Sequence, residues 1–248
     1  MEAPLDDLTG RVIYLTGDLD RKLTSLMRRI LRPGDLFLDV GANLGLMTLQ
    51  GSRLVGAQGM VIAFEPNPAV RELLKSSVER NGYRQVSVMD CALGKRESQA
   101  VLHVPMHNAG QATLMDDAYS GSVREVTIDV KRLDDVLDQL ALKTNPRLLK
   151  IDVEGVELDV LRGASERLSH GVPDYVLFEH WGYRLGCGIE EDSLFACLLD
   201  YGYTIYGLPK AMIRLTLSRI KRSEPAMGSD FLAVSPHSQV TELGISVT

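Results

Sequence analysis

The chain has 248 residues, of which 45% are hydrophobic, and a formal net charge of −6 at pH 7. This length suits one α/β domain with added segments, and the acidic balance disfavours a general nucleic-acid binder, which needs basic residues to meet phosphates. No run of eighteen apolar residues occurs, so we expect no transmembrane helix and no membrane partner. The N-terminus does not resemble a signal peptide and the three cysteines are scattered, so we expect a cytoplasmic protein.

Helices and strands are predicted to alternate along the chain. Residues 20–31 carry apolar residues at helical spacing, and Pro33-Gly34 ends that helix. Short apolar runs then predict strands at 36–40, 60–64, 86–90, 147–153, 174–180, 203–208 and 230–235, and two more between 95 and 130. Helices are predicted at 44–55, 69–81, 133–140, 156–168 and 190–199.

This alternation predicts an α/β fold with a mostly parallel sheet and helices on both faces. The last two strands have no full helix between them, which predicts an antiparallel edge hairpin. We expect residues 1–33 to form an N-terminal segment with a leading helix, and residues 34–248 to form a Rossmann-like domain, so that the chain is a single domain overall.

Nearly every predicted strand ends in an acidic residue. Ligands of open α/β sheets bind at the carboxyl ends of the strands. The residues to inspect are therefore Asp39, Glu65, Asp90, Asp152 and Glu179.

The first predicted strand ends in the turn DVGANLG, residues 39–45. Gly41 permits a sharp turn and Gly45 permits close packing of the next helix, whose start should present free backbone N–H groups to a carboxylate or phosphate. Glu65 stands where an acid commonly accepts hydrogen bonds from ribose hydroxyls. Asn43 occupies the second glycine position of the dinucleotide fingerprint, which disfavours a pyrophosphate. A nicotinamide-dependent oxidoreductase is therefore a disfavoured alternative, and a module that binds its ligand without catalysis is the non-enzymatic alternative.

Six motifs occur in order along the chain: DVGANLG, FEPNP, ERNGY, CALG, NAGQATL and LKIDVEGVELDVLRGA. Together they resemble the FkbM family of methyltransferases, over about residues 34–180. The resemblance implies a class I methyltransferase fold with a seven-stranded sheet, S-adenosyl-L-methionine as the cofactor, and a hydroxyl oxygen as the usual methyl acceptor. Known members act on sugars, polyketides and other small natural products, so a small-molecule acceptor is expected.

The resemblance also implies a set of cofactor contacts. The wall around the methionine part is implied to consist of Asp39, Gly41, Ala42, Asn43 and Gly45. Thr48 resembles a position that contacts the carboxylate, Glu65 resembles the ribose acceptor, and Pro66 shapes its turn. Asp90 is implied to accept from the adenine amino group, with Ala92 beside the ring. In the NAGQATL loop, Gln111 and Thr113 are the candidate acceptor contacts.

Lys150 and Asp152 alternate with apolar residues and share one face of a predicted strand. Burying both is costly unless they pair or serve the site. We predict Asp152 or His180 as the base that takes a hydroxyl proton, with Lys150, Glu154 and Glu179 as further catalytic candidates. Four of these residues could also bind Mg²⁺: Asp152, Glu154, Glu179 and His180. We nevertheless expect a reaction without metal.

Overall fold

The structure is a computed structural model, and it describes residues 1–2, 8–17, 20–105, 112–115, 123–180, 193–209, 215–220 and 229–248. Eight α-helices lie in these ranges: α1 Leu8–Thr16, α2 Arg21–Ile30, α3 Leu46–Val55, α4 Pro68–Arg80, α5 Leu133–Leu140, α6 Glu157–Arg162, α7 Ser165–Ser169 and α8 Ser193–Asp200. The strands are β1 Leu36–Val40, β2 Met60–Phe64, β3 Val86–Met89, β4 Ala92–Leu93, β5 Ser98–Pro105, β6 Val123–Lys131, β7 Pro146–Ile151, β8 Tyr175–Glu179, β9 Thr204–Gly207, β10 Thr216–Arg219, β11 Asp230–Val234 and β12 Ser246–Val247.

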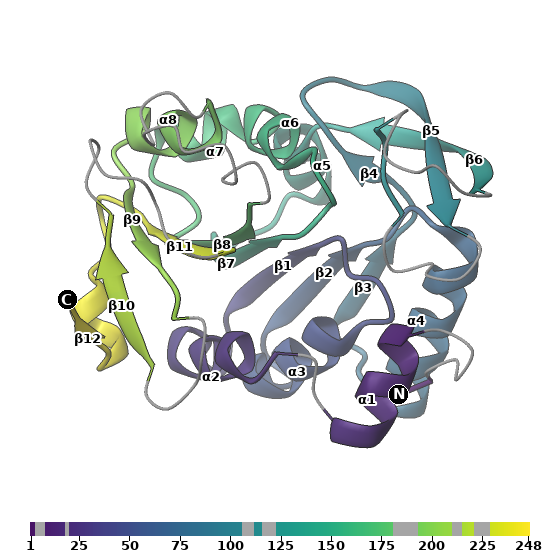
Figure 1. The fold of residues 1–248 in the computed structure, drawn as a ribbon, viewed down its shortest axis with the longest axis horizontal. Coiled ribbons are helices and arrows are strands. Elements are labelled where there is room, and N and C mark those ends of the chain that lie inside the picture. Colours follow the sequence, from purple (N-terminus) through teal and green to yellow (C-terminus); the bar gives the residue numbers. More distant parts are fainter. Residues whose placement is uncertain are drawn as a thin grey trace.

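One large sheet crosses the molecule in the order β12-β10-β9-β11-β8-β7-β1-β2-β3 (Figure 1). The strands from β8 to β3 pair in parallel. Helical crossovers connect β1 to β2, β2 to β3 and β7 to β8. β11 is antiparallel to both β8 and β9. The predicted class, a Rossmann-like α/β fold with a mostly parallel sheet and an antiparallel segment, is confirmed. The described sheet has nine strands where seven are expected, because β10 and β12 extend it beyond β9.

Helices cover both faces of the large sheet, with α2 and α3 below it and α5 to α8 above it in Figure 1. Alternation along each strand divides the core accordingly. Leu38 and Phe178 pack with the helices of the upper face, whereas Phe37 and Leu177 pack with α2 and α3. Every residue of β1 is buried, as expected for a strand covered on both faces.

Several features go beyond the sequence prediction. The predicted pairing of the last two long strands is present, with Leu232 opposite Tyr206, but β11 lies inside the sheet and β10 and β12 continue it beyond β9. The two strands predicted between 95 and 130 form a separate three-stranded sheet with β4. The single helix predicted over 156–168 is divided into α6 and α7. Among the described residues, no helix combines the length and the apolar character needed to cross a bilayer.

Candidate functional site

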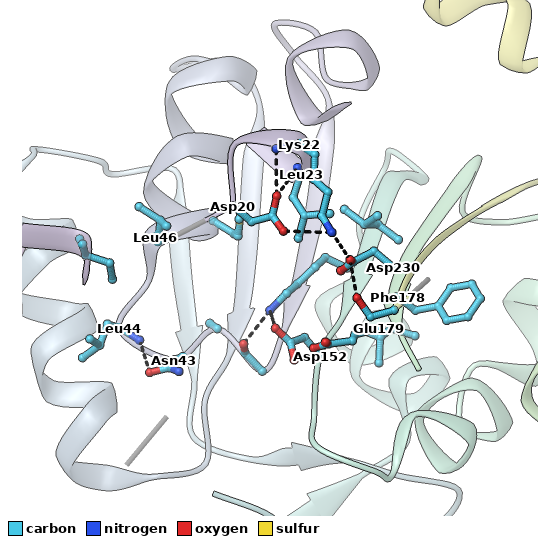
Figure 2. A pocket seen from close by; sticks show the side chains of 18 residues that line it. Asp20, Lys22, Leu23, Asn43, Leu44, Leu46, Asp152, Phe178, Glu179 and Asp230 are labelled. Carbon is cyan, nitrogen blue, oxygen red and sulfur yellow. Dashed lines mark hydrogen bonds and ion pairs between the residues drawn. The ribbon is translucent and has the colours of Figure 1, made fainter. Parts of the chain in front are cut away.

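A pocket of about 250 Å³ opens at the carboxyl ends of β1, β7 and β8. Its described lining combines the turn after β1, the starts of α2 and α3, and the first residue of β11 (Figure 2). The lining residues are Ile13, Asp20, Lys22, Leu23, Gly41, Ala42, Asn43, Leu44, Leu46, Met47, Lys150, Ile151, Asp152, Leu177, Phe178, Glu179, Ser229 and Asp230. The predicted strand-end residues Asp152 and Glu179 therefore face one pocket.

The turn after β1 lies directly against the end of β7. Gly41 has a φ of 74°, and a Cβ on it would lie 1.8 Å from the backbone oxygen of Asp152. Asn43 has a φ of 51°, a conformation that asparagine tolerates better than most residues, and its Oδ1 accepts from the amide of Leu44 at 2.7 Å. A Cβ on Gly45 would lie 2.2 Å from the side chain of Leu74. The turn is thus fixed by close contacts on both sides.

The five amides of this turn all donate within the protein. The amides of Gly41 and Ala42 donate to the carbonyl of Phe64, and that of Gly45 donates to Ala42. The amides of Asn43 and Leu44 donate to side-chain oxygens. The predicted free amides belong to the next helix, α3, whose first-turn amides have no partner within the helix.

Glu65 follows β2, and two backbone amides hold its carboxylate in place. Oε2 accepts from Asn43 and Oε1 accepts from Asn67, each at 2.8 Å. Burial raises the pKa of Glu65 to about 7, although both amides, Lys150 and Arg71 oppose the rise. Arg71 also donates to the carbonyl of Pro66 at 2.9 Å, which fixes the predicted turn residue. Each carboxylate oxygen keeps further acceptor capacity. Glu65 is not among the described residues that line the pocket, so its contact with ribose stays a prediction.

A chain of buried polar groups runs beneath the pocket. Thr48 donates to Oδ2 of Asp39 at 2.6 Å. Nζ of Lys150 lies 3.3 Å from Oδ1 of Asp39 and 3.4 Å from Oδ2 of Asp152, and it donates to the carbonyl of Gly41 at 2.8 Å. Asp39 and Thr48 are fully buried, so the predicted direct contact of Thr48 with a carboxylate is replaced by a role in holding Asp39.

Lys150 remains a cation in this environment. Burial by itself lowers the pKa of its ammonium group, but Asp152 and Asp39 reverse that effect, so that the pKa is raised. Its three N–H groups face three acceptors. Lys150 therefore positions its neighbours and does not serve as a proton acceptor.

Glu154 follows β7 in a left-handed conformation, with a φ of 53°. Burial first, then the charges of Asp152 and Glu157, raises the pKa of its carboxyl group to about 7. Its carbonyl accepts from the hydroxyl of Thr113 at 2.7 Å. Thr113 is buried, so its predicted substrate contact is replaced by support of this turn. Gln111 lies outside the described residues.

The two predicted residues at the end of β8 are placed differently. Glu179 lines the pocket. The ring of His180 packs edge-on against Phe195 of α8, with centroids 5.3 Å apart, and His180 is not among the described lining residues. The geometry therefore favours Asp152 over His180 as the proton acceptor.

Asp90 and Ala92, the predicted adenine contacts, follow β3. Asp90 is exposed and Ala92 is half-buried. Neither is among the described residues that line the pocket, so their roles stay predictions. Within the described ranges, no group of three or more histidine, cysteine or acidic side chains is arranged to hold a metal ion.

Sequence reasoning missed a polar cluster on the opposite pocket wall, made of Asp20, Lys22 and Asp230. Nζ of Lys22 forms ion pairs with both carboxylates, at 3.4 Å with Oδ2 of Asp20. Asp20 caps α2 by accepting from the amides of Lys22 and Leu23. An acid just before an amphipathic helix is a capping signal that could have been recognised. No sequence signal pointed to Lys22 or Asp230.

Comparisons with known proteins identify the family of the chain. Residues 39–204 match the family described as "Methyltransferase FkbM domain". The chain is 31% identical over 166 residues to Methyltransferase 1 of Beauveria bassiana, covering 60% of this chain and 61% of that protein. It is 29% identical over 178 residues to Methyltransferase sdnD of Sordaria araneosa, covering 60% and 63%. The chain thus spans about three fifths of these relatives.

A larger protein and a solved structure are also similar. The AMB antimetabolite synthetase AmbE of Pseudomonas aeruginosa is 28% identical over 213 residues, which are 71% of this chain and 10% of that protein. A crystal structure of Methyltransferase FkbM from Methylobacillus flagellatus aligns with a TM-score of 0.47 and 18% identity, covering 90% of this chain and 52% of that one.

The chain belongs to the FkbM methyltransferase family, a class of S-adenosyl-L-methionine-dependent proteins, and the predicted membership is confirmed. The cofactor that this family implies is S-adenosyl-L-methionine, which replaces the nicotinamide alternative. The residues of the candidate site suit S-adenosyl-L-methionine. Glu65 offers a carboxylate at the end of β2, and four carboxylates on the pocket wall suit a positively charged sulfur: Asp20, Asp152, Glu179 and Asp230.

Proposed function

We propose that this chain is an S-adenosyl-L-methionine-dependent O-methyltransferase that acts on a hydroxyl group of a small molecule. The observation that carries the proposal is the carboxylate of Asp152, which lines the pocket with a side chain 41% exposed. The buried ammonium group of Lys150 holds it from below. A carboxylate oriented in this way is suited to accept a proton from a bound hydroxyl group.

Bound S-adenosyl-L-methionine supplies a methyl group already activated on a positively charged sulfur. The pocket has to hold the acceptor oxygen in line with the methyl–sulfur bond. Asp152 accepts the hydroxyl proton as the oxygen–carbon bond forms and the electron pair of the carbon–sulfur bond stays on sulfur. Glu179 lies on the same wall and orients the acceptor by accepting a second hydrogen bond.

The acceptor is proposed to be a sugar, a polyketide or another natural product. The similarity to a protein named as an antimetabolite synthetase supports this class. Residues 34–248 are proposed as the methyltransferase domain, to which the segment 1–33 adds part of the pocket wall through Asp20 and Lys22.

The test is incubation with ¹³C-methyl-labelled S-adenosyl-L-methionine and a panel of hydroxylated sugars, polyketides and phenols, with amine- and carboxylate-bearing compounds as controls. The expected product is a methyl ether, recognised by its methoxy carbon signal, and it should form equally in EDTA. Labelled methylamines or methyl esters would contradict O-methylation. S-adenosylhomocysteine binding without any product across the panel would favour the non-catalytic module.

A further inference from the structure

The amino-acid end of the cofactor carries one ammonium and one carboxylate group, and both need partners when they leave water. The turn after β1 supplies no free donor for the carboxylate, because the amides from Gly41 to Gly45 all donate within the protein. The hydroxyl of Thr48 is likewise committed to Asp39. The donors left for the carboxylate are the first-turn amides of α3 and the cations on the pocket wall.

Two cations line the pocket in the described part of the chain, Lys22 and Lys150. Lys150 already faces three acceptors, the carbonyl of Gly41 and the carboxylates of Asp39 and Asp152. The Lys150 side chain is only 7% exposed. Lys22 has ion-pair contacts with two carboxylates and its side chain is 16% exposed, so its ammonium group is the more accessible of the two to a ligand.

The polar cluster Asp20–Lys22–Asp230 forms part of the pocket wall, and two of its three side chains are largely buried. The Lys22 side chain is 16% exposed and that of Asp230 is 10% exposed. Asp230 is fixed at the start of β11, opposite Glu179 of β8, and its Oδ2 also accepts from the hydroxyl of Ser229 at 2.9 Å. Figure 2 shows Lys22 between the two carboxylates, with Asp152 across the pocket.

We propose that the polar cluster Asp20–Lys22–Asp230 binds the zwitterionic amino-acid end of the cofactor, with Lys22 facing its carboxylate and Asp230 facing its ammonium group. Lys22 and Asp230 are opposite in sign to the carboxylate and ammonium groups that they face, while Asp20 keeps its ion pair with Lys22. This inference rests on the cofactor site of the proposed function. It assigns a binding role to residues outside the matched segment 39–204.

The test compares three ligands by calorimetry: S-adenosylhomocysteine, its decarboxylated form S-adenosyl-3-thiopropylamine, and 5′-methylthioadenosine, which lacks the whole amino-acid end. Lys22→Met should weaken S-adenosylhomocysteine binding about 10–100-fold, the scale of one charge-assisted hydrogen bond. It should leave the other two ligands unaffected. Asp230→Asn should weaken both amine-bearing ligands and spare 5′-methylthioadenosine.

Lys22→Arg is the matched control, because it keeps the charge and should restore most of the S-adenosylhomocysteine affinity. Equal weakening of all three ligands by Lys22→Met would reveal a general structural effect and overturn the inference. Unchanged affinity would also overturn it, leaving the first-turn amides of α3 as the carboxylate donors. If the wild-type protein binds none of the three ligands, the proposed function fails together with this inference.

Discussion

The ammonium nitrogen of Lys150 lies 3.4 Å from Oδ2 of Asp152, at the point where β7 ends. The same nitrogen donates to the carbonyl of Gly41. One buried lysine thus connects the proposed proton acceptor to the turn that begins the cofactor site. Its charge also compensates the fully buried carboxylate of Asp39, 3.3 Å away.

Replacing Lys150 by methionine should destabilise the protein strongly. The change keeps the length of the side chain but leaves the carboxylate of Asp39 buried without its cation. Removing one partner of a buried ion pair costs about 3–5 kcal/mol, and urea denaturation should show a loss of that size. The double variant Lys150→Met/Asp39→Asn should recover much of it, because the buried charge is gone. A double variant no more stable than the single one would refute this account.

Binding of S-adenosylhomocysteine should weaken as the pH falls below about 7, the pKa to which burial raises Glu65. We predict that the ionised carboxylate accepts hydrogen bonds from the ribose hydroxyls, so that binding is complete above that pKa and is lost as the group protonates. The affinity should then fall about tenfold per pH unit, as calorimetry at several pH values would show.

Glu65→Gln should bind weakly and without this pH dependence. Glu154 provides the matched control, because the pKa of its carboxyl group is also raised to about 7. Glu154→Gln should keep the wild-type pH dependence of binding. The assignment of Glu65 as the ribose acceptor fails if Glu154→Gln, and not Glu65→Gln, removes the pH dependence of binding.

Gly41→Ala should disrupt the site far more than Gly34→Ala. Both glycines have a positive φ, which costs about 1–2 kcal/mol for an L-residue. Only at Gly41 would the added Cβ meet the backbone, 1.8 Å from the oxygen of Asp152, whereas at Gly34 nothing lies within 4 Å. Thermal denaturation and S-adenosylhomocysteine binding should both separate the variants. Similar losses of stability and of affinity in the two variants would show that the contact of Gly41 with the end of β7 is unimportant.

The sequence indicated one side of the pocket well. Parallel strands end at a common edge, so acids at strand ends pointed to Asp152 and Glu179, which line the pocket, and to Asp39 beneath it. The same rule also pointed to Glu65 and Asp90, which are not among the described lining residues. The rule does not find Asp230, because β11 runs antiparallel and therefore begins at that edge. The rule does not find Lys22 either, because Lys22 lies on a helix that precedes the sheet.

Sequence periodicity also indicates which face of a helix or strand a side chain lies on, but not which group that side chain contacts. Thr48 and Thr113 were expected to contact ligands, yet their hydroxyls donate to Asp39 and to the carbonyl of Glu154. The strands β10 and β12, at one end of the sheet, have four and two residues and no strong alternation. Such short segments carry too little pattern for the sequence to indicate them.

The most direct test of the account is the rate of methyl transfer by Asp152→Asn at saturating cofactor and acceptor. The substitution keeps the shape and removes the charge of the proposed proton acceptor, so the rate should fall about 10²–10⁴-fold. His180→Gln, whose wild-type ring packs against Phe195, should stay near the wild-type rate. A near wild-type rate for Asp152→Asn, or a large loss for His180→Gln alone, would contradict the proposed role of Asp152.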